Sequence, residues 1–203
     1  MSVTETIQKA KKGDEESLGA LLASYERYLK LLAEVQLGGE LRRKVDASDI
    51  VQETFLEAHR AFERFEGTQG DQLIAWLKSI LATRLANTMR HYLGTQARDI
   101  RLEKRIGQGF DQSAMSLGGL LAAPGSTPSQ HVASREQAQL AAEALLRLPA
   151  DYRDVIVMRH LEGETFPTIA KTMNRSVDSV EKLWLRGMAK LKREVKQEER
   201  DGL

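Results

Sequence analysis

Residues 165–195 read TFPTIAKTMNRSVDSVEKLWLRGMAKLKREV, and this stretch decides the fold of the C-terminal part of the chain. Thr165 is suited to cap a short helix, with Pro167 in its first turn, where a missing N–H costs little. Asn174 tolerates the left-handed conformation of a tight corner, and Ser176 is suited to cap the next helix. The pattern predicts a helix, a short turn and a second helix, which is a helix-turn-helix.

The second of these helices has one apolar and one polar face. The apolar face is predicted to hold Val180, Leu183, Trp184, Gly187 and Leu191. Residues 171–196 contain eight basic and three acidic residues, a net charge of +5. A basic helix of this kind suits the major groove of DNA, where Arg, Lys and Ser contact base edges and phosphates. A plain helical hairpin with a solvated charged face is the alternative.

Two further helices are predicted before this motif, over residues 130–148 and 150–162. Pro149 separates them, and Gly163 is suited to end the second. The run Val155 to Met158 has strand propensity, but its helical flanks favour a helix. Six of the fifteen glycines and the turn-rich AAPGSTPSQ lie between residues 94 and 130. This composition predicts a flexible linker, 94–129, between a domain over 1–93 and a domain over 130–203.

The N-terminal domain is also predicted to be helical, because its sequence contains no proline. Leucines and Tyr25 recur at helical spacing over residues 18–32, before the Gly38-Gly39 break. A second helix begins at Asp46, which is suited to cap it, and a third runs from about Leu73 to Tyr92. The fold class is therefore all-α, with two small helical domains joined by a linker.

Charge is unevenly distributed along this domain. Residues 46–71 carry seven acidic and two basic residues, a net charge of −5, whereas residues 84–105 carry six basic and two acidic ones, a net charge of +4. An acidic helix face repels DNA and suits a basic protein partner, with a merely solvated face as the alternative. On the third helix a polar stripe lies opposite the leucines. It consists of Ser79, Thr83, Asn87 and Arg90.

The whole-chain composition excludes several classes of protein. The 203 residues contain no cysteine and four scattered histidines, so we expect no metal site and no metal enzyme. No stretch resembles a signal peptide or a membrane span, and we expect a cytoplasmic protein. The formal net charge of +1, taken alone, argues against a nucleic-acid partner, but it averages over segments of opposite sign.

Two motifs carry a resemblance to a known family. DASDIVQETFLEAHRAFERFEG, followed by IAWLKSILATRLANTMRHY, resembles region 2 of the extracytoplasmic-function (group 4) sigma factors of bacterial RNA polymerase. LLRLPADYRDVIVMRHLEGETFPTIAKTMNRSVDSVEKLWLRGMAKLKRE resembles their region 4. The longer run GGELRRKVDASDIVQETFLEAHR, together with GTQARDIR, resembles the variety found in planctomycetes.

The resemblance implies roles for residues in region 2. Asp49, Gln52 and Glu53 match the face that docks on the clamp helices of the largest core polymerase subunit. The segment from Phe65 to Asp71 resembles the loop that pockets a flipped base of the −10 promoter element. The matching positions for −10 DNA are Phe65, Glu66, Gly67, Thr68, Trp76, Ser79, Thr83, Asn87 and Arg90. A core aromatic is the alternative role of Trp76.

Region 4 of the family reads the −35 element as a duplex. The positions here that match are Arg175, Ser176, Asp178, Ser179, Lys182 and Arg186. Family members usually have Gly in place of Asn174 and a Ser-Arg pair in place of Lys182 and Leu183. Lys is a poorer bidentate partner of guanine than Arg, so the preferred −35 sequence stays open.

The resemblance implies a sigma factor that binds core RNA polymerase, recognises −10 and −35 promoter elements and promotes DNA melting. Such a protein is a binding protein, so we expect neither enzyme activity nor a cofactor. It also implies a linker that runs through the polymerase towards the RNA exit path, with an inert tether as the alternative, and an anti-sigma factor as a further partner. Two other functions stay open from the sequence. They are a free-standing helix-turn-helix regulator, which has no need of the acidic helix face, and a protein-binding helical adaptor, which leaves the basic segments unexplained.

Overall fold

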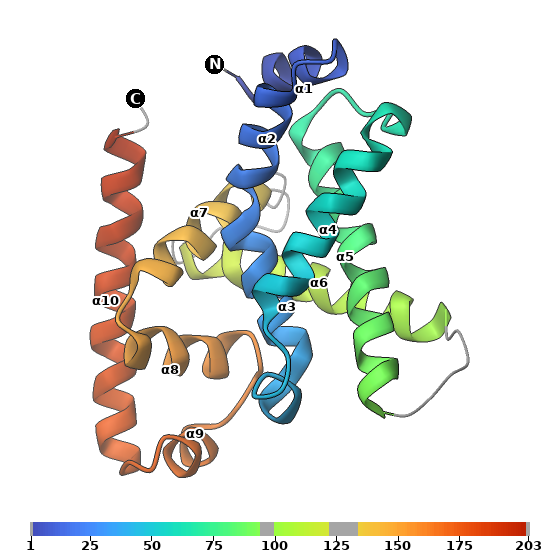
Figure 1. The fold of residues 1–203 in the computed structure, drawn as a ribbon. Coiled ribbons are helices and arrows are strands. Elements are labelled where there is room, and N and C mark those ends of the chain that lie inside the picture. The colour runs from blue at the N-terminus through green and yellow to red at the C-terminus, as the bar shows by residue number, and fades with distance from the viewer. Residues whose placement is uncertain (1, 94–99, 122–133, 202–203) are drawn as a thin grey trace. The chain divides into compact units, whose positions relative to one another are not determined.

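The computed structural model describes residues 2–93, 100–121 and 134–201, and all regular structure within them is helical (Figure 1). The predicted all-α class is therefore confirmed. The chain divides into two compact units, Met1–Asp111 and Gln112–Leu203. Within the described ranges, no helix is both long and apolar enough to span a membrane.

Unit 1 is a helical bundle whose helices begin at well-formed caps. Ser2, Asp14 and Asp46 each accept a hydrogen bond from a backbone N–H in the first turn of the helix that follows. The cap predicted at Asp46 is thus confirmed. The elements are α1 (Val3–Lys11), α2 (Glu15–Ser24), α3 (Glu26–Leu41), α4 (Ala47–Ala61), the 3-10 turn η1 (Phe62–Arg64), α5 (Gly70–Leu93) and the first half of α6 (Ile100–Leu121).

The core of unit 1 lies where α3, α4 and α5 pack together. Leu73, Leu77, Leu81 and Leu85 of α5 are fully buried, at the helical spacing read from the sequence. The single helix expected over residues 18–32 is instead two, because the chain tightens at Tyr25, whose N–H bonds Leu22 three residues back.

Helix α6 lies within the predicted linker, 94–129, and shows that part of this segment is a regular helix. Leu102, Ile106 and Phe110 recur every fourth residue along its first half and are all buried. Buried apolar contacts of this kind outweigh the low helix propensity of the glycines between them. At Gly109 the helix approaches α3 so closely that a Cβ atom would lie 2.5 Å from the side-chain amide of Gln36. The rest of the predicted linker, 94–99 and 122–129, lies outside the described residues.

Unit 2 contains the predicted helix-turn-helix. Its elements are the second half of α6, α7 (Ser134–Arg147), α8 (Ala150–His160), α9 (Phe166–Thr172) and α10 (Val177–Asp201), with α10 packed against α7, α8 and α9 (Figure 1). The Oγ1 of Thr165 accepts the N–H of Thr168, and Asn174 has a φ of 51°, as predicted for the cap and the corner. Gly163 has a φ of 73°, consistent with its predicted role at the end of α8. Residues 155–158 are helical, not a strand.

Candidate nucleic-acid and protein interfaces

One face of α4 is exposed to solvent. Asp49, Gln52 and Glu53 are all exposed, at the i, i+3 and i+4 positions of one helix side. The opposite side is buried, and there the hydroxyl of Thr54 donates to the carbonyl of Ile50 over 2.8 Å. The structure therefore brings the three predicted residues together on the surface.

The same face of α4 includes an apolar side chain that the sequence analysis did not single out. Leu56 is 58% exposed and follows Glu53 by three residues. Its signal in the sequence is that it lies off the buried stripe of α4 and is still a large apolar residue. At the edge of the face, Glu57 pairs with Arg84 of α5 over 2.8 Å. An apolar centre with a charged rim is typical of protein interfaces.

The loop between η1 and α5 is built on an aromatic cluster. Phe65 is buried, and its ring stacks on that of Trp76 with centroids 5.0 Å apart, while Phe62 meets Trp76 edge-on at 6.2 Å. Trp76 is only partly buried, so it both packs and presents some of its surface. Glu66 and Thr68 are exposed beside this cluster.

Two contacts hold the backbone of this loop. The Oε1 atom of Gln72 accepts the N–H groups of Thr68 and Gln69, at 2.8 and 3.2 Å. A Cβ atom on Gly67 would lie 2.4 Å from Cζ of Phe65, so only glycine fits there without displacing the ring. Gln72 was not among the predicted residues, because a side chain that bonds backbone leaves no pattern in the sequence.

Helix α1 also borders the loop. Lys11 lies over the ring of Phe65, with Nζ 5.4 Å from the centroid, in a cation–π contact. Val3 lies next to Gly70, where a Cβ atom would be 3.1 Å from the valine methyl. The loop is thus supported by a helix far from it in sequence.

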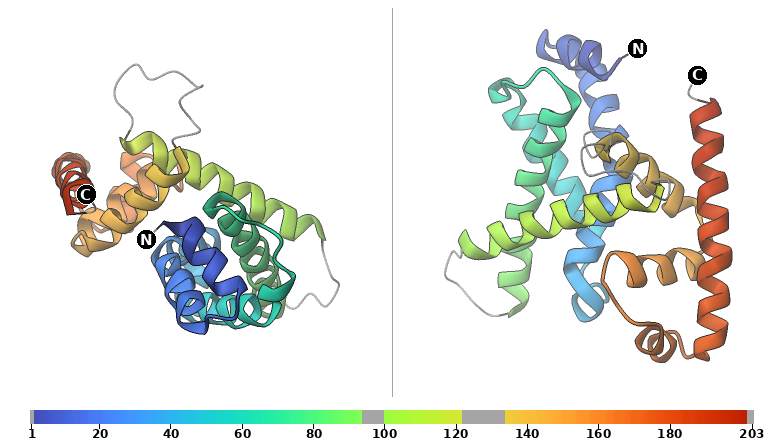
Figure 2. Two further views of the ribbon diagram at one scale, coloured as in Figure 1. Left: turned by 90° about the horizontal axis from the view of Figure 1, so that it is seen from above. Right: turned by 180° about the vertical axis from the view of Figure 1, so that it is seen from behind.

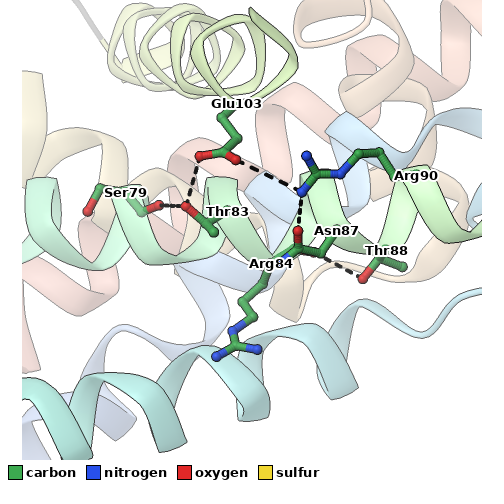
Figure 3. A network of polar contacts seen from close by, with 7 residues as sticks. All are labelled: Ser79, Thr83, Arg84, Asn87, Thr88, Arg90 and Glu103. Atoms are coloured by element: carbon green, nitrogen blue, oxygen red, sulfur yellow. Dashed lines mark hydrogen bonds and ion pairs between the residues drawn. The ribbon is translucent and has the colours of Figure 1, made fainter. Parts of the chain in front are cut away.

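The polar stripe of α5 is present but is not open to solvent along its whole length. Helix α6 crosses α5 (Figure 2), and Ser79, Thr83, Asn87 and Arg90 lie along one side of α5, where Thr83 and Arg90 reach towards Glu103 of α6 (Figure 3). The Oγ1 of Thr83 donates to a carboxylate oxygen of Glu103 on α6 over 3.2 Å. Arg90 bonds the side chain of Asn87 and lies 4.0 Å from Glu103, and Lys78 pairs with Asp111. A cavity of about 400 Å³ separates the two helices between these contacts.

In unit 2, the predicted DNA-reading residues gather at the start of α10. Arg175, Ser176, Asp178, Lys182 and Arg186 are exposed. Ser179 is half-buried, and its N–H donates to Oγ of Ser176 over 3.2 Å.

Two of these cationic side chains form ion pairs with acidic residues. Arg175 pairs with Asp151 over 2.6 Å, and Lys182 pairs with Asp178 over 2.8 Å. Within the described part of unit 2, Arg186 has no such pair. Leu185, 58% exposed beside Arg186, is an apolar side chain on this surface that the sequence analysis did not choose.

A cluster behind this surface fixes α10 to α8 and α9. The indole N–H of Trp184 donates to Nε2 of His160 over 3.0 Å, and their rings stack. Phe166 meets Trp184 edge-on at 5.6 Å, and Arg159 lies over the Phe166 ring at 4.9 Å. Burial, and secondarily the charge of Arg159, holds the pKa of His160 below its usual value. The imidazole is therefore kept in the neutral form that accepts the indole N–H.

Comparison with known proteins agrees with this arrangement. The family model described as Sigma-70 region 2 matches residues 24–98, and the model described as Sigma-70, region 4 matches residues 138–191. Similar proteins include the ECF RNA polymerase sigma-E factor of Haemophilus influenzae, 28% identical over 177 residues that cover 86% of this chain and 85% of the relative. The protein of the same name from Escherichia coli K12 is 28% identical over 174 residues, 86% of this chain and 84% of the relative. With both regions present in order, the chain belongs to the sigma-70 family, as an RNA polymerase sigma factor of the extracytoplasmic-function group.

Proposed function

We propose that this sigma factor has three separate binding surfaces, one for core RNA polymerase and two for promoter DNA. The observation that carries the proposal is the separation of charge. The acidic residues Asp49 and Glu53 share an exposed face of α4 with the neutral Gln52, while cations and polar groups line α5 and the start of α10. Each surface suits a different partner, because DNA repels the first and attracts the other two.

The α4 face is the proposed docking surface for core RNA polymerase, on the clamp helices of its largest subunit. Asp49 and Glu53 supply charge for a basic partner, and Leu56 supplies exposed apolar area between them and Glu57. Nucleotide chemistry belongs to the core enzyme, and this chain supplies recognition, in the cytoplasm where the polymerase works.

The loop from Phe65 to Asp71 and the polar stripe of α5 are proposed to bind the melted −10 element. A flipped base needs a shaped pocket with a stacking surface, which the partly exposed Trp76 and the exposed Glu66 and Thr68 border. The displaced strand needs donors along its backbone, and Arg90, Asn87 and Thr83 are arranged along one line of α5.

The start of α10 is proposed to enter the major groove of the −35 duplex. Arg186 is exposed and suited to guanine, and Asp178 is suited to accept from a cytosine amino group. An anti-sigma factor, if this protein has one, is expected to compete for these same surfaces.

Transcription with purified core polymerase tests the proposal. Genomic fragments are transcribed by core alone and by core with this protein, and the RNA 5′ ends are mapped. We expect new start sites that share sequence near −10 and −35. Core whose start sites are the same with and without the protein refutes the proposed function.

A further inference from the structure

Helix α6 places two carboxylates on the polar stripe of α5. Glu103 and Asp111 are the acidic residues of α6, eight positions apart, and each contacts α5 within unit 1. Glu103 lies against the side of α5 that carries Thr83 and Arg90 (Figure 3), and Asp111 pairs with Lys78 of the same helix. Two of the residues proposed to bind a DNA strand, Thr83 and Arg90, therefore already have an anionic partner.

The contact at Glu103 is largely withdrawn from solvent. The side chains of Arg90 and Glu103 are 12% and 19% exposed, and the carboxylate reaches both Thr83, at 3.2 Å, and Arg90, at 4.0 Å. The Nη1 atom of Arg90 is buried without a hydrogen-bond partner in the described part of the chain. The guanidinium of Arg90 therefore has an ion-pair partner but does not use all of its N–H donors. An anion that accepted hydrogen bonds from both Nη atoms would bind it more strongly than Glu103 does.

A carboxylate and a phosphate can accept hydrogen bonds from the same donors, here the hydroxyl of Thr83 and the guanidinium of Arg90. Both are anionic acceptors of hydrogen bonds from hydroxyl, amide and guanidinium groups. Thr83 and Arg90 cannot bind a DNA phosphate while the Glu103 carboxylate contacts them, because the carboxylate and the phosphate would occupy the same space. Closure by α6 and binding of the strand therefore exclude each other.

The attachment of α6 is suited to being reversible. Its buried residues Leu102, Ile106 and Phe110 hold it to unit 1, while Gly107 and Gly109 lower its intrinsic helix stability. The ion pairs include exposed groups, and such pairs contribute little. A helix of this kind can leave its site when a competing ligand binds.

We propose that α6 is an intramolecular clasp that closes the strand-binding face of α5 in the free protein, with Glu103 and Asp111 standing where DNA phosphates bind. The proposal rests on the proposed role of α5 in strand binding. The free protein then binds melted DNA weakly until α6 is displaced, and the apparent affinity is lowered by the fraction of molecules in the closed state.

Charge variants of the full chain give the first test. The probe is fluorescein-labelled oligothymidylate, followed by anisotropy without core polymerase. We expect the double variant Glu103→Gln and Asp111→Asn to bind it about fivefold or more tighter than the wild type, since an opened fraction raises apparent affinity directly. The matched control, Glu15→Gln and Glu16→Gln on exposed positions of α2, removes the same charge and is expected to change affinity less than twofold. Equal effects of the two double variants, or no effect of either, overturn the proposal.

A reversible cross-link gives the second test, and the absence of natural cysteines makes it specific. Lys78→Cys and Asp111→Cys replace a pair that joins α5 to α6, and a short bis-methanethiosulfonate reagent connects the new thiols. We expect the cross-linked protein to lose oligothymidylate binding and to regain it after reduction. Because both states share one sequence, a folding defect would affect them equally. Cross-linked protein that binds as tightly as reduced protein contradicts the clasp.

Failure of the clasp can be told from failure of the function proposed for α5. Arg90→Ala is introduced into the Glu103→Gln, Asp111→Asn background. If α5 binds the strand, this change lowers oligothymidylate affinity. If the triple variant keeps its affinity for oligothymidylate, the strand binds elsewhere and the proposed role of α5 is refuted. Lost affinity, together with no gain from the charge variants, keeps that role and refutes only the clasp.

Discussion

Gly67 lies at a point in the loop before α5 where a side chain has no room. A Cβ atom there would be 2.4 Å from Cζ of Phe65 and 2.9 Å from Cβ of Gln72. Phe65 cannot move away easily, because its ring is stacked on Trp76 and covered by Lys11. The loop therefore depends on a glycine for reasons of space.

We predict that Gly67→Ala destabilises unit 1 by about 1–3 kcal/mol, the usual cost of forcing extra volume into a packed site. It should also weaken opening of the −10 element. Thermal unfolding followed by circular dichroism measures the first effect. Gly19→Ala is the control, because its Cβ atom meets nothing within 4 Å and Ala favours the helix. A Gly67→Ala protein that melts at or above the wild-type temperature contradicts this explanation.

His160 makes the stability of unit 2 depend on pH. Its pKa is held below the usual value of 6.5, first by burial and then by Arg159. Above pH 6.5 the imidazole is neutral in both the folded and the unfolded chain, and the full stability is present. As the pH falls below that value, the unfolded chain binds a proton first, so stability is lost.

We predict that the free energy of unfolding of unit 2 falls as the pH is lowered through and below 6.5, and that His160→Gln removes most of this slope. Gln keeps an acceptor for the Trp184 indole but does not titrate. Urea unfolding at several pH values measures the slope. It is followed by Trp184 fluorescence in a Trp76→Phe background, because Trp76 and Trp184 are the two tryptophans and the background variant leaves only the one in unit 2. Identical slopes in the two proteins would show that another group is responsible.

At the level of elements, α4 has a buried side and an exposed side, and the exposed side is the one proposed to bind polymerase. Ile50, Val51 and Ala58 are buried, whereas Glu53 faces solvent. We predict that Glu53→Lys lowers the affinity for core polymerase by about tenfold or more while leaving the helix content unchanged, because it introduces repulsion at the centre of the face. Co-purification with core polymerase measures this affinity. Glu16→Lys on α2 is the control, because it makes the same charge reversal away from the α4 face. Undiminished co-purification of Glu53→Lys refutes the assignment.

The first turns of helix α10 carry the proposed DNA-reading residues, and the helix continues beyond them to Asp201. We predict that Arg186→Ala weakens binding of the −35 duplex by about 1–3 kcal/mol, if the guanidinium contacts a base. Arg193→Ala, further along the same helix, should weaken binding less. The measurement is holoenzyme binding to a duplex from a mapped promoter. Equal losses for the two variants would indicate a general charge effect instead of base reading.

The sequence predicted helices better than it predicted what they contact. The caps at Asp46 and Thr165 and the corner at Asn174 follow from local chemistry, and the structure has them as expected. Helix α6 could not be foreseen, because its glycines indicate a linker and its stability comes from burial against residues distant in sequence. Leu56 and Leu185 lie off the buried stripes of their helices, but the sequence does not show that they belong to a binding surface, because that depends on the residues that the fold brings beside them.

For the whole molecule, a net charge of +1 conceals segments of strongly opposite sign. In unit 1 the acidic α4 packs beside α5, whose polar stripe lies on another surface, and we propose that the two surfaces bind different partners. Weak overall attraction to DNA would leave promoter choice to the complex with polymerase. Tight, salt-resistant binding of the isolated full-length protein to promoter duplex would count against this interpretation.

The most direct test of the account is permanganate footprinting of a mapped promoter, because permanganate oxidises unpaired thymines. Holoenzyme containing the wild-type protein should make thymines reactive around the −10 element, and Arg90→Ala should reduce that reactivity because the strand loses a cation on α5. Core alone should leave them paired. Thymines that stay unreactive with holoenzyme, or that react equally with core alone, would contradict the central claim that this chain opens promoter DNA.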